Sequence, residues 1–293
     1  MLGGDGNRRI ARLLTALAVV VSGVVGFSLL DSSGSRSHAV PKRWIPTGQD
    51  RWIYEIGGAA PKLGACAKPW SGRRCVRPTV WVLDLYRADN RTPNAQAVGA
   101  IRANGGHAVC YVSAGSVEGW RPDAAAFPDS VIGLSLEGWP AERWIDIRQL
   151  GVLRPILEGR ADHCGRAGFE AIDWDNVDGH TRETGFPLRP HDQLRYNRML
   201  ASIAHERGLS VGLKNDLTQI SALVGSFDFA VNEQCAQFDE CDLLLPFSRA
   251  GKAVVQIEYL VEPGVFCAEA NQRRWSAMVA DRDLAGRVWR PCR

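Results

Sequence analysis

Acidic side chains gather in one short stretch of the chain, between Phe169 and His180. Three aspartates, Asp173, Asp175 and Asp178, fall within six residues there, directly after a short apolar run. Carboxylates this close repel one another and lose solvation free energy on burial, so stability alone does not favour the cluster. The simpler interpretation is a solvated loop in which Asp and Asn cap the next helix. Because the acids come where a buried strand is expected to end, we predict a reactive site here.

Other polar side chains follow short apolar runs in the same way. They share a position at the downstream end of an expected strand, and in a barrel of parallel strands these ends meet at one rim. One such acid could be a helix cap, but so many at matching ends favour a common site. The set comprises Asp84, Ser113, Asp173, Asp175, Lys214, Asn215, Asp216, Glu233, Glu258 and Tyr259.

The residue types in this set indicate carboxylate chemistry. Only His180 and His191 lie near it, so a zinc site or a histidine-based triad is not expected, and no Gly-x-Ser-x-Gly elbow occurs. A calcium loop starting at Asp173 fails, because glycine is missing where that loop requires it. We expect no metal and no cofactor. Magnesium on Asp173 and Asp175 stays an alternative, which would leave Glu233 without a role.

A pair of carboxylates facing across a sugar ring accounts for the set best. Glycoside hydrolysis needs one acid to protonate the leaving oxygen and a second acid to attack the sugar or to activate water. Aromatic rings at the rim could stack on sugar faces, although most tryptophans serve packing. The candidates for stacking are Tyr111, Trp120, Trp139 and Trp174.

Short apolar runs alternate with helical stretches from about residue 51 onward. This alternation predicts an α/β fold, a single (β/α)8 TIM barrel over residues 51–293, with a long irregular insertion rich in Trp and Pro after the third strand. An open doubly wound sheet is the alternative, but its glycine-rich phosphate loop is absent. We expect a helix near 271–280 before a weak last strand. The expected strands are 52–56, 80–85, 107–113, 169–175, 209–213, 227–233, 253–259 and 286–290.

Charge and the N-terminal residues bear on where the protein acts. The net charge of +3 and the scattered arginines do not favour nucleic-acid binding. Arginines precede an uncharged apolar run at 13–30, a pattern typical of a signal peptide or an uncleaved membrane anchor. We therefore assign residues 1–30 to a signal or anchor and residues 31–50 to a linker, and we expect a secreted or extracytoplasmic protein.

Eight cysteines fit an oxidising compartment. Metal-ligand spacing such as Cys-x-x-Cys is absent from the sequence. Cys110 and Cys164 fall on an expected strand and an expected helix, and we interpret them as candidate free thiols. The expected disulfides, which close short loops or hold the C-terminal end, are Cys66 with Cys75, Cys235 with Cys241, and Cys267 with Cys292.

Six motifs occur in a consistent order over about residues 50–260: Val109–Asp123, Trp139–Asp146, Asp175–Gly179, Gly212–Asp216, Asn232–Cys235 and Glu258–Tyr259. Together they resemble the motifs of glycoside hydrolase family 114, the endo-α-1,4-polygalactosaminidases. The resemblance implies a TIM-barrel catalytic domain that cleaves α-1,4-linked galactosamine polymers with retention of configuration.

The resemblance also implies roles for single residues. Asp175 and Glu233 match the catalytic acids, with Asp175 as nucleophile and Glu233 as general acid/base by analogy with other barrel α-glycosidases. Lys214 would keep Asp175 ionised, and the acids around the pocket would suit a cationic amino sugar. The predicted substrate-binding residues are Asp84, Tyr111, Trp120, Asp173, Lys214, Asn215 and Glu258.

The expected partner is therefore an amino-sugar polysaccharide, bound by a monomer. Two other classes stay open at this point: a non-catalytic carbohydrate-binding barrel at the cell surface, and a metal-dependent hydrolase. Intact Asp175 and Glu233 argue against the binding barrel, because a binding protein need not keep an acid pair.

Overall fold

The computed structural model describes residues 43–57 and 60–293. They belong to one compact unit, Val40–Arg293. The predicted signal or anchor at 1–30 and most of the predicted linker lie outside the described residues. Among the described helices, none is long and apolar enough to cross a membrane.

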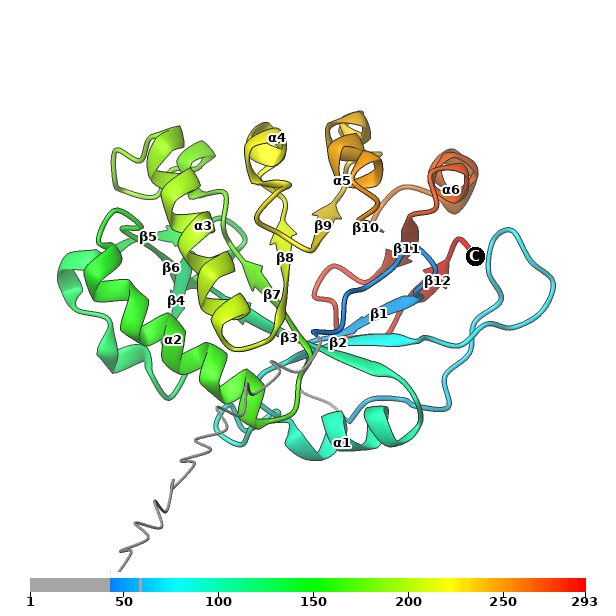
Figure 1. Ribbon diagram of the computed structural model, residues 1–293, viewed down its shortest axis with the longest axis horizontal. Helices are drawn as coiled ribbons and strands as arrows, with labels where there is room; N and C mark the ends of the chain where they lie inside the picture. Colours follow the sequence, from blue (N-terminus) through cyan, green and yellow to red (C-terminus); the bar gives the residue numbers. More distant parts are fainter. Residues whose placement is uncertain (1–42, 58–59) are drawn as a thin grey trace, which may run out of the picture. The chain divides into compact units, whose positions relative to one another are not determined.

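Eight parallel strands form the central sheet, and their order in space follows their order in the chain (Figure 1). This is the strand arrangement of a (β/α)8 TIM barrel, so the predicted fold is confirmed. The strands are β1 (Trp52–Glu55), β2 (Val80–Asp84), β3 (His107–Ser113), β7 (Ala171–Asp175), β8 (Ser210–Lys214), β9 (Phe229–Glu233), β10 (Ala253–Glu258) and β11 (Ser276–Ala280).

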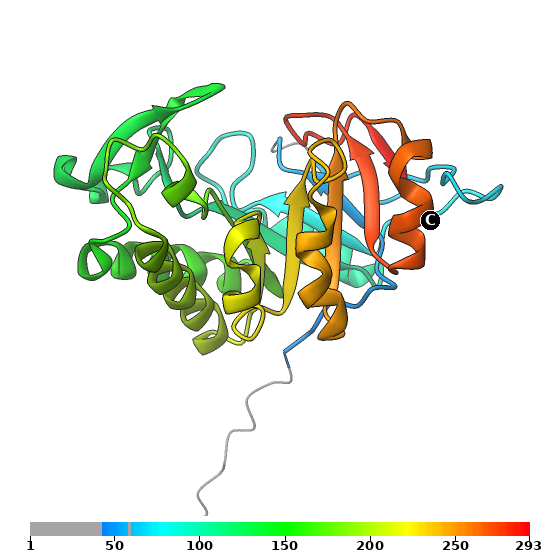
Figure 2. The same cartoon turned by 90° about the horizontal axis from the view of Figure 1, so that it is seen from above.

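Helices cover the outer face of this sheet (Figures 1 and 2). The loop that follows β1 carries the disulfide Cys66–Cys75 in place of a helix. Short 3-10 turns η1 to η5 span Ala124–Ala126, Asp129–Val131, Gly179–Thr181, Leu217–Gln219 and Cys241–Leu244. The α-helices are α1 (Ala95–Ala103), α2 (Leu150–Arg166), α3 (Pro190–Glu206), α4 (Ile220–Leu223), α5 (Leu245–Arg249) and α6 (Pro263–Gln272).

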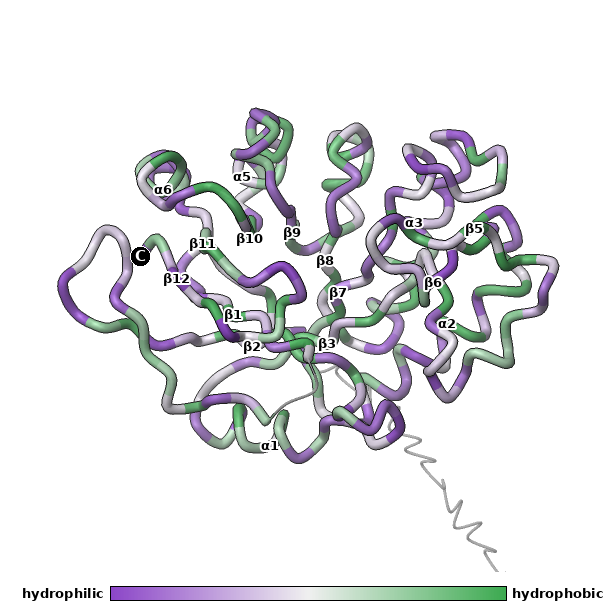
Figure 3. Tube along the Cα trace, turned by 180° about the vertical axis from the view of Figure 1, so that it is seen from behind, coloured by the Kyte–Doolittle hydropathy of each residue, from purple (hydrophilic) through white to green (hydrophobic). Residues whose placement is uncertain are grey.

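Each barrel strand serves two hydrophobic cores, because successive side chains point to opposite faces. In β10, Val255 and Ile257 pack inside the barrel, whereas Val254 packs between the strands and the helices. All six residues of β10 are buried. Figure 3 shows such apolar stretches along β10 and β11. Strands buried on both faces appear in the sequence as continuous apolar runs, which is why they could be predicted.

The same alternation directs three charged side chains to the barrel interior. Inside the barrel, Gly212 of β8 makes room for the ring of Phe229, since a Cβ on this glycine would lie 2.4 Å from that ring. Two residues further along β8, Lys214 points the same way, at the end of the strand. Asp175 and Glu233 end the neighbouring strands β7 and β9, and their side chains also point into the barrel. Barrel geometry thus places all three at one rim.

The C-terminal end differs from the sequence prediction. The helix expected at 271–280 is wrong. The helix found there, α6, already ends at Gln272, and Ser276–Ala280 forms the eighth parallel strand, β11. The segment expected as the last strand instead contributes β12 (Trp289–Pro291), which runs antiparallel to β11. The indole of Trp289 donates a hydrogen bond to the carbonyl of Trp52 in β1. Therefore β12 contacts both the first barrel strand, β1, and the last, β11. A five-residue apolar run cannot be assigned to helix or strand by periodicity alone, which explains the error.

The insertion after β3 folds as a small sheet, whereas the sequence predicted an irregular segment. It contains β4 (Ser116–Glu118), β5 (Ile132–Leu136) and β6 (Trp139–Ile145), in the antiparallel order β4-β6-β5. Figure 2 shows its hairpin projecting from the barrel. Most of β6 is exposed, so its sequence lacks the apolar alternation that identifies a half-buried strand.

Residues at the end of the predicted linker pack against the barrel. The Trp44 ring stacks on His107, at the start of β3, with ring centroids 4.2 Å apart. Arg43 forms a 3.0 Å ion pair with Asp228, directly before β9. The barrel unit therefore includes residues that the sequence assigned to the linker.

All eight cysteines are paired. The three expected disulfides are confirmed. The interpretation of Cys110 and Cys164 as free thiols is wrong, because they form a fourth disulfide that joins β3 to α2. Both residues are fully buried. They lie 54 residues apart in sequence, and only the packing of α2 on the barrel brings them together.

Removing the Cys110–Cys164 disulfide should destabilise the barrel most. Replacing both cysteines by alanine frees a loop of 54 residues, and chain entropy predicts a loss of about 4 kcal/mol in the free energy of unfolding. Urea denaturation measures the loss. The Cys66→Ala, Cys75→Ala double variant is the control, since its loop spans only 9 residues and should cost at most about 3 kcal/mol. Equal stability of wild type and the Cys110, Cys164 variant would contradict the prediction.

Candidate active site

A cavity of about 470 Å³ opens at the C-terminal ends of the barrel strands. The barrel supplies its floor, and the inserted sheet with the loop that follows β4 supplies one wall. Residues from both parts line it, among them Asp84, Tyr111, Asp175, Lys214, Glu233 and Tyr259 from the barrel, and Glu118, Trp120, Arg121, Trp139 and Glu142 from the insertion.

Lys214 lies between the two predicted catalytic acids. Its Nζ is 2.9 Å from Oδ1 of Asp175 and 3.4 Å from Oε2 of Glu233. The strand order β7-β8-β9 causes this, because the three residues end three adjacent strands. The lysine side chain is only 2% exposed, whereas the two acids keep 16% and 23% of their surface open to the cavity.

The environment of Asp175 favours its ionised form. Burial by itself would raise the pKa of this carboxyl, but the Lys214 ammonium and a hydrogen bond from the Tyr111 hydroxyl hold it below the ordinary value. Burial lowers the pKa of Lys214, and the surrounding carboxylates more than reverse that effect and raise it. Around neutral pH the pair is therefore a carboxylate and an ammonium.

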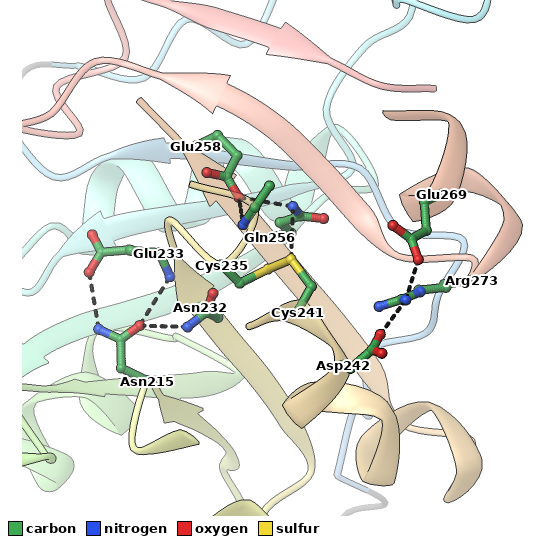
Figure 4. Close-up of a disulfide and its surroundings, with 11 residues drawn as sticks. Asn215, Asn232, Glu233, Cys235, Cys241, Asp242, Gln256, Glu258, Glu269 and Arg273 are labelled. Carbon is green, nitrogen blue, oxygen red and sulfur yellow. Dashed lines mark hydrogen bonds and ion pairs between the residues drawn. A yellow bond between two sulfur atoms is a disulfide. The ribbon is translucent and has the colours of Figure 1, made fainter. Parts of the chain in front are cut away.

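Besides Lys214, neutral donors hold Glu233. The Asn215 side chain donates to Oε2 at 3.2 Å and accepts from the Glu233 backbone N–H at 3.0 Å (Figure 4). The Tyr259 hydroxyl donates to Oε1. The Asn232 side chain donates to the side-chain oxygen of Asn215 at 3.2 Å and so fixes the orientation of the Asn215 amide. The carboxyl of Glu233 is thus positioned from two neighbouring strand ends.

Asp173 lies below the cavity and does not line it. Its Oδ2 accepts a 3.0 Å hydrogen bond from Tyr54, and its Oδ1 is buried without a partner. Burial, opposed by Lys214 and assisted by the Asp175 charge, raises the pKa of Asp173 to about 6. Trp174, a candidate for sugar stacking, is fully buried outside the barrel interior and cannot reach the cavity.

Asp84 lines the cavity, but its charge is already paired. Both its oxygens accept hydrogen bonds from Arg121, at 2.8 and 2.6 Å. The same guanidinium binds Glu118 through two further bonds. Trp120, next to Arg121, lines the cavity with 40% of its surface exposed. Asp84 therefore anchors the insertion on the barrel.

Glu258 lies away from the cavity, although its position at a strand end predicted otherwise. It is fully buried and accepts hydrogen bonds from the Ala236 backbone N–H at 2.8 Å and from Gln256 at 2.9 Å (Figure 4). Its carboxylate and the sulfurs of Cys235 and Cys241 lie within 4.8 Å of one another, the one such group of metal-ligating types found in the described residues. The two sulfurs are joined in a disulfide. Glu258 thus supports the loop that follows Glu233.

The sequence analysis gave no role to several residues that line the cavity. Three of them belong to the insertion, where position relative to a barrel strand end gives no signal, and two follow the barrel strands β7 and β11. They are Glu118, Arg121, Glu142, Asn176 and Arg282.

A TIM barrel with a carboxylate pair at its C-terminal rim is the architecture of many enzymes that act on glycosidic bonds. The chain belongs to glycoside-hydrolase family GH114, whose sequence model matches residues 34–293. It is a glycosidase. No curated protein matches the chain in sequence.

Two solved structures illustrate the likeness. Aspergillus fumigatus Ega3 in complex with galactosamine is 31% identical to this chain with a TM-score of 0.73, and the match covers 83% of this chain and 95% of that one. The glycoside hydrolase domain of PelA from Pseudomonas aeruginosa is 18% identical with a TM-score of 0.57, over 80% of this chain and 96% of that one. At that identity the second likeness concerns the fold alone.

Replacing the buried Asp173 should change how stability depends on pH. The folded pKa of about 6 lies above the unfolded value, so between about pH 4 and pH 6 the native state holds a proton that the unfolded chain has released. The contribution of Asp173 to wild-type stability therefore falls as pH rises through this window. Asp173→Asn removes that loss, so from pH 4 to pH 7 the variant should gain about 2 kcal/mol relative to wild type.

Urea unfolding of both proteins at several pH values measures the gain. Asp239→Asn, a change of the same kind at an exposed residue, is the control and should follow the wild-type curve. A constant difference between wild type and Asp173→Asn across the window would show that Asp173 does not titrate there.

Proposed function

We propose that this glycosidase cleaves α-1,4-linked galactosamine-containing polysaccharide with retention of configuration, with Asp175 as nucleophile and Glu233 as general acid/base. The observation that carries the proposal is the buried Lys214, which contacts both acids at the cavity floor. The similar structure of Ega3 was solved in complex with galactosamine, which supports the choice of sugar.

The roles follow from the different surroundings of the two acids. Asp175, ionised beside Lys214, attacks the anomeric carbon while the glycosidic C–O bond breaks, and Glu233 gives its proton to the leaving oxygen. Glu233 then takes a proton from water, and that water displaces Asp175 from the sugar. Lys214 and Tyr111 stabilise the Asp175 carboxylate when it leaves.

The spacing of the acids supports retention. Lys214 Nζ contacts one oxygen of each, so these two oxygens can be no farther apart than the sum of 2.9 Å and 3.4 Å. Retaining enzymes keep their carboxyl groups about 5–5.5 Å apart, whereas inverting enzymes need about 6.5–9.5 Å to admit a water. This upper limit on the oxygen–oxygen distance lies below the inverting range, which favours direct attack by Asp175.

The cavity charge supports a cationic amino sugar. Six carboxylates but only four cations line it, and two of those cations, Lys214 and Arg121, are each shared between two carboxylates. The excess negative potential attracts an ammonium group and disfavours an anionic sugar.

We also propose that the protein acts outside the cytoplasm and as a monomer. Four disulfides fit an oxidising compartment, and the apolar run at 13–30 fits export. Both proposed catalytic acids come from one chain, which fits a monomer.

Loss of either acid should abolish hydrolysis while the fold persists. Asp175→Asn removes the nucleophile and Glu233→Gln removes the proton donor. Each substitution should lower kcat on deacetylated galactosamine polymer by about 10²–10⁴-fold. Released oligosaccharide measures the rate, circular dichroism checks folding, and NMR of the first product should show the α anomer.

Three results would contradict this assignment in different ways. Wild type that binds the polymer but releases nothing would indicate a binding protein. Activity abolished by a chelator would indicate a metal-dependent hydrolase. Unchanged activity in either variant would remove that residue from catalysis.

Trp120 should contribute a stacking surface for the sugar. Trp120→Ala should raise KM about tenfold and change kcat little, because an aromatic face contributes binding free energy without touching the reacting atoms. Trp70→Ala is the matched control, since Trp70 is 47% exposed but does not line the cavity. Equal effects of the two substitutions on KM would argue against stacking at Trp120.

A further inference from the structure

Glu142 differs from the other carboxylates of the cavity in having no cation beside it. Arg121 pairs with Asp84 and Glu118, while Lys214 pairs with the two proposed catalytic acids. Within the described part of the chain, Glu142 forms no ion pair, and Arg282, which also lines the cavity, is not paired with it. It is instead held by neutral donors, the Ser116 hydroxyl at 2.8 Å and the Asn176 amide at 3.5 Å.

The position of Glu142 is costly for the fold. In the ladder between β4 and β6, Glu142 stands directly opposite Glu118. Like charges facing one another across two strands destabilise a sheet. Arg121 neutralises one glutamate of the pair but is already shared with Asp84. The hydrogen bonds from Ser116 and Asn176 do not neutralise the second glutamate, so its unpaired charge points to a role in binding.

Glu142 also lies close to the reaction centre. The Asn176 amide that approaches Glu142 also donates to the hydroxyls of Ser113 and Ser116, at 3.0 and 3.1 Å. Asn176 directly follows Asp175 and adopts a left-handed conformation, with φ 61°. This bend turns the asparagine side chain from the strand end toward the insertion. The carboxylate of Glu142 is therefore fixed on the cavity wall beside the proposed nucleophile.

We infer that the Glu142 carboxylate is the counter-ion for the substrate's ammonium group and selects the deacetylated amino sugar. This rests on the proposed function and assigns its sugar specificity to one residue. An ammonium supplies the missing positive charge and donates to the open carboxylate oxygen. An N-acetyl group in that place brings no charge and leaves Glu142 unpaired, so acetylated sugar binds less well.

The electrostatics around Glu142 agree with this role. Burial and the charges of Glu118 and Asp175 outweigh the hydrogen bond from Ser116 and the attraction of Arg121, and raise the pKa of Glu142 to about 7. A bound ammonium favours the ionised carboxyl, so binding near pH 7 releases protons. Affinity for galactosamine should accordingly rise between about pH 5.5 and pH 7.

Titration calorimetry with three monosaccharides tests the inference without hydrolysis. Wild type should bind galactosamine about tenfold more tightly than N-acetylgalactosamine or galactose. Glu142→Gln should remove this preference, leave the other two affinities unchanged and abolish proton release. Glu137→Gln, the same change in the same hairpin but outside the cavity, should behave as wild type. An intact preference in Glu142→Gln, or an equal loss for all three sugars, would overturn the inference.

Kinetics on the polymer provide a second test of the role of Glu142. With deacetylated galactosamine polymer, Glu142→Gln should raise KM about tenfold and leave kcat within about threefold. An unchanged KM would overturn the role of Glu142. Absence of cleavage by wild type would instead overturn the proposed function, and a galactosamine preference that depends on Glu142 would still be measured by calorimetry.

Discussion

A buried ammonium group governs the centre of this protein. Lys214 is 2% exposed and contacts carboxylate oxygens of Asp175 and Glu233. Moving an ammonium out of water costs several kcal/mol, and only closely placed opposite charges offset that loss. The lysine and the two acids are therefore mutually dependent. A fold that buries a charged Lys214 must bring carboxylate oxygens close to it.

The barrel satisfies this requirement through strand order. β8 lies between β7 and β9, and the side chains that end these three strands all face the interior. Below them, the ring of Phe229 fills the space that Gly212 leaves, so the floor under the lysine contains packed side chains. Tyr111 and Tyr259 donate to the carboxylate oxygens that Lys214 does not contact, and Asn215 donates to the Glu233 oxygen that the lysine also contacts. The result is a rigid site on rigid elements, which is the condition for precise catalysis.

The insertion after β3 adds a second, separate charge system. Arg121 joins Asp84 of the barrel to Glu118 of the small sheet and so fixes the wall on the rim. That wall carries Trp120, Trp139 and Glu142 into the cavity. The barrel thus holds the groups suited to bond cleavage, and the insertion holds the groups suited to choosing the sugar. Scaffolds with variable loops commonly divide their work in this way.

The sequence by itself determined the barrel, three of the four disulfides, and the strand ends where Asp175, Lys214 and Glu233 stand. Continuous apolar runs between helical stretches identify buried parallel strands, and polar residues at their ends are a local signal. Only the tertiary structure decided which of those polar residues reach the cavity. Asp173 and Glu258 carry the same local signal as Asp175, yet both are buried away from it. The Cys110–Cys164 disulfide and the wall residue Glu142 likewise depend on elements distant in sequence, and no local pattern encodes which distant partner a side chain meets.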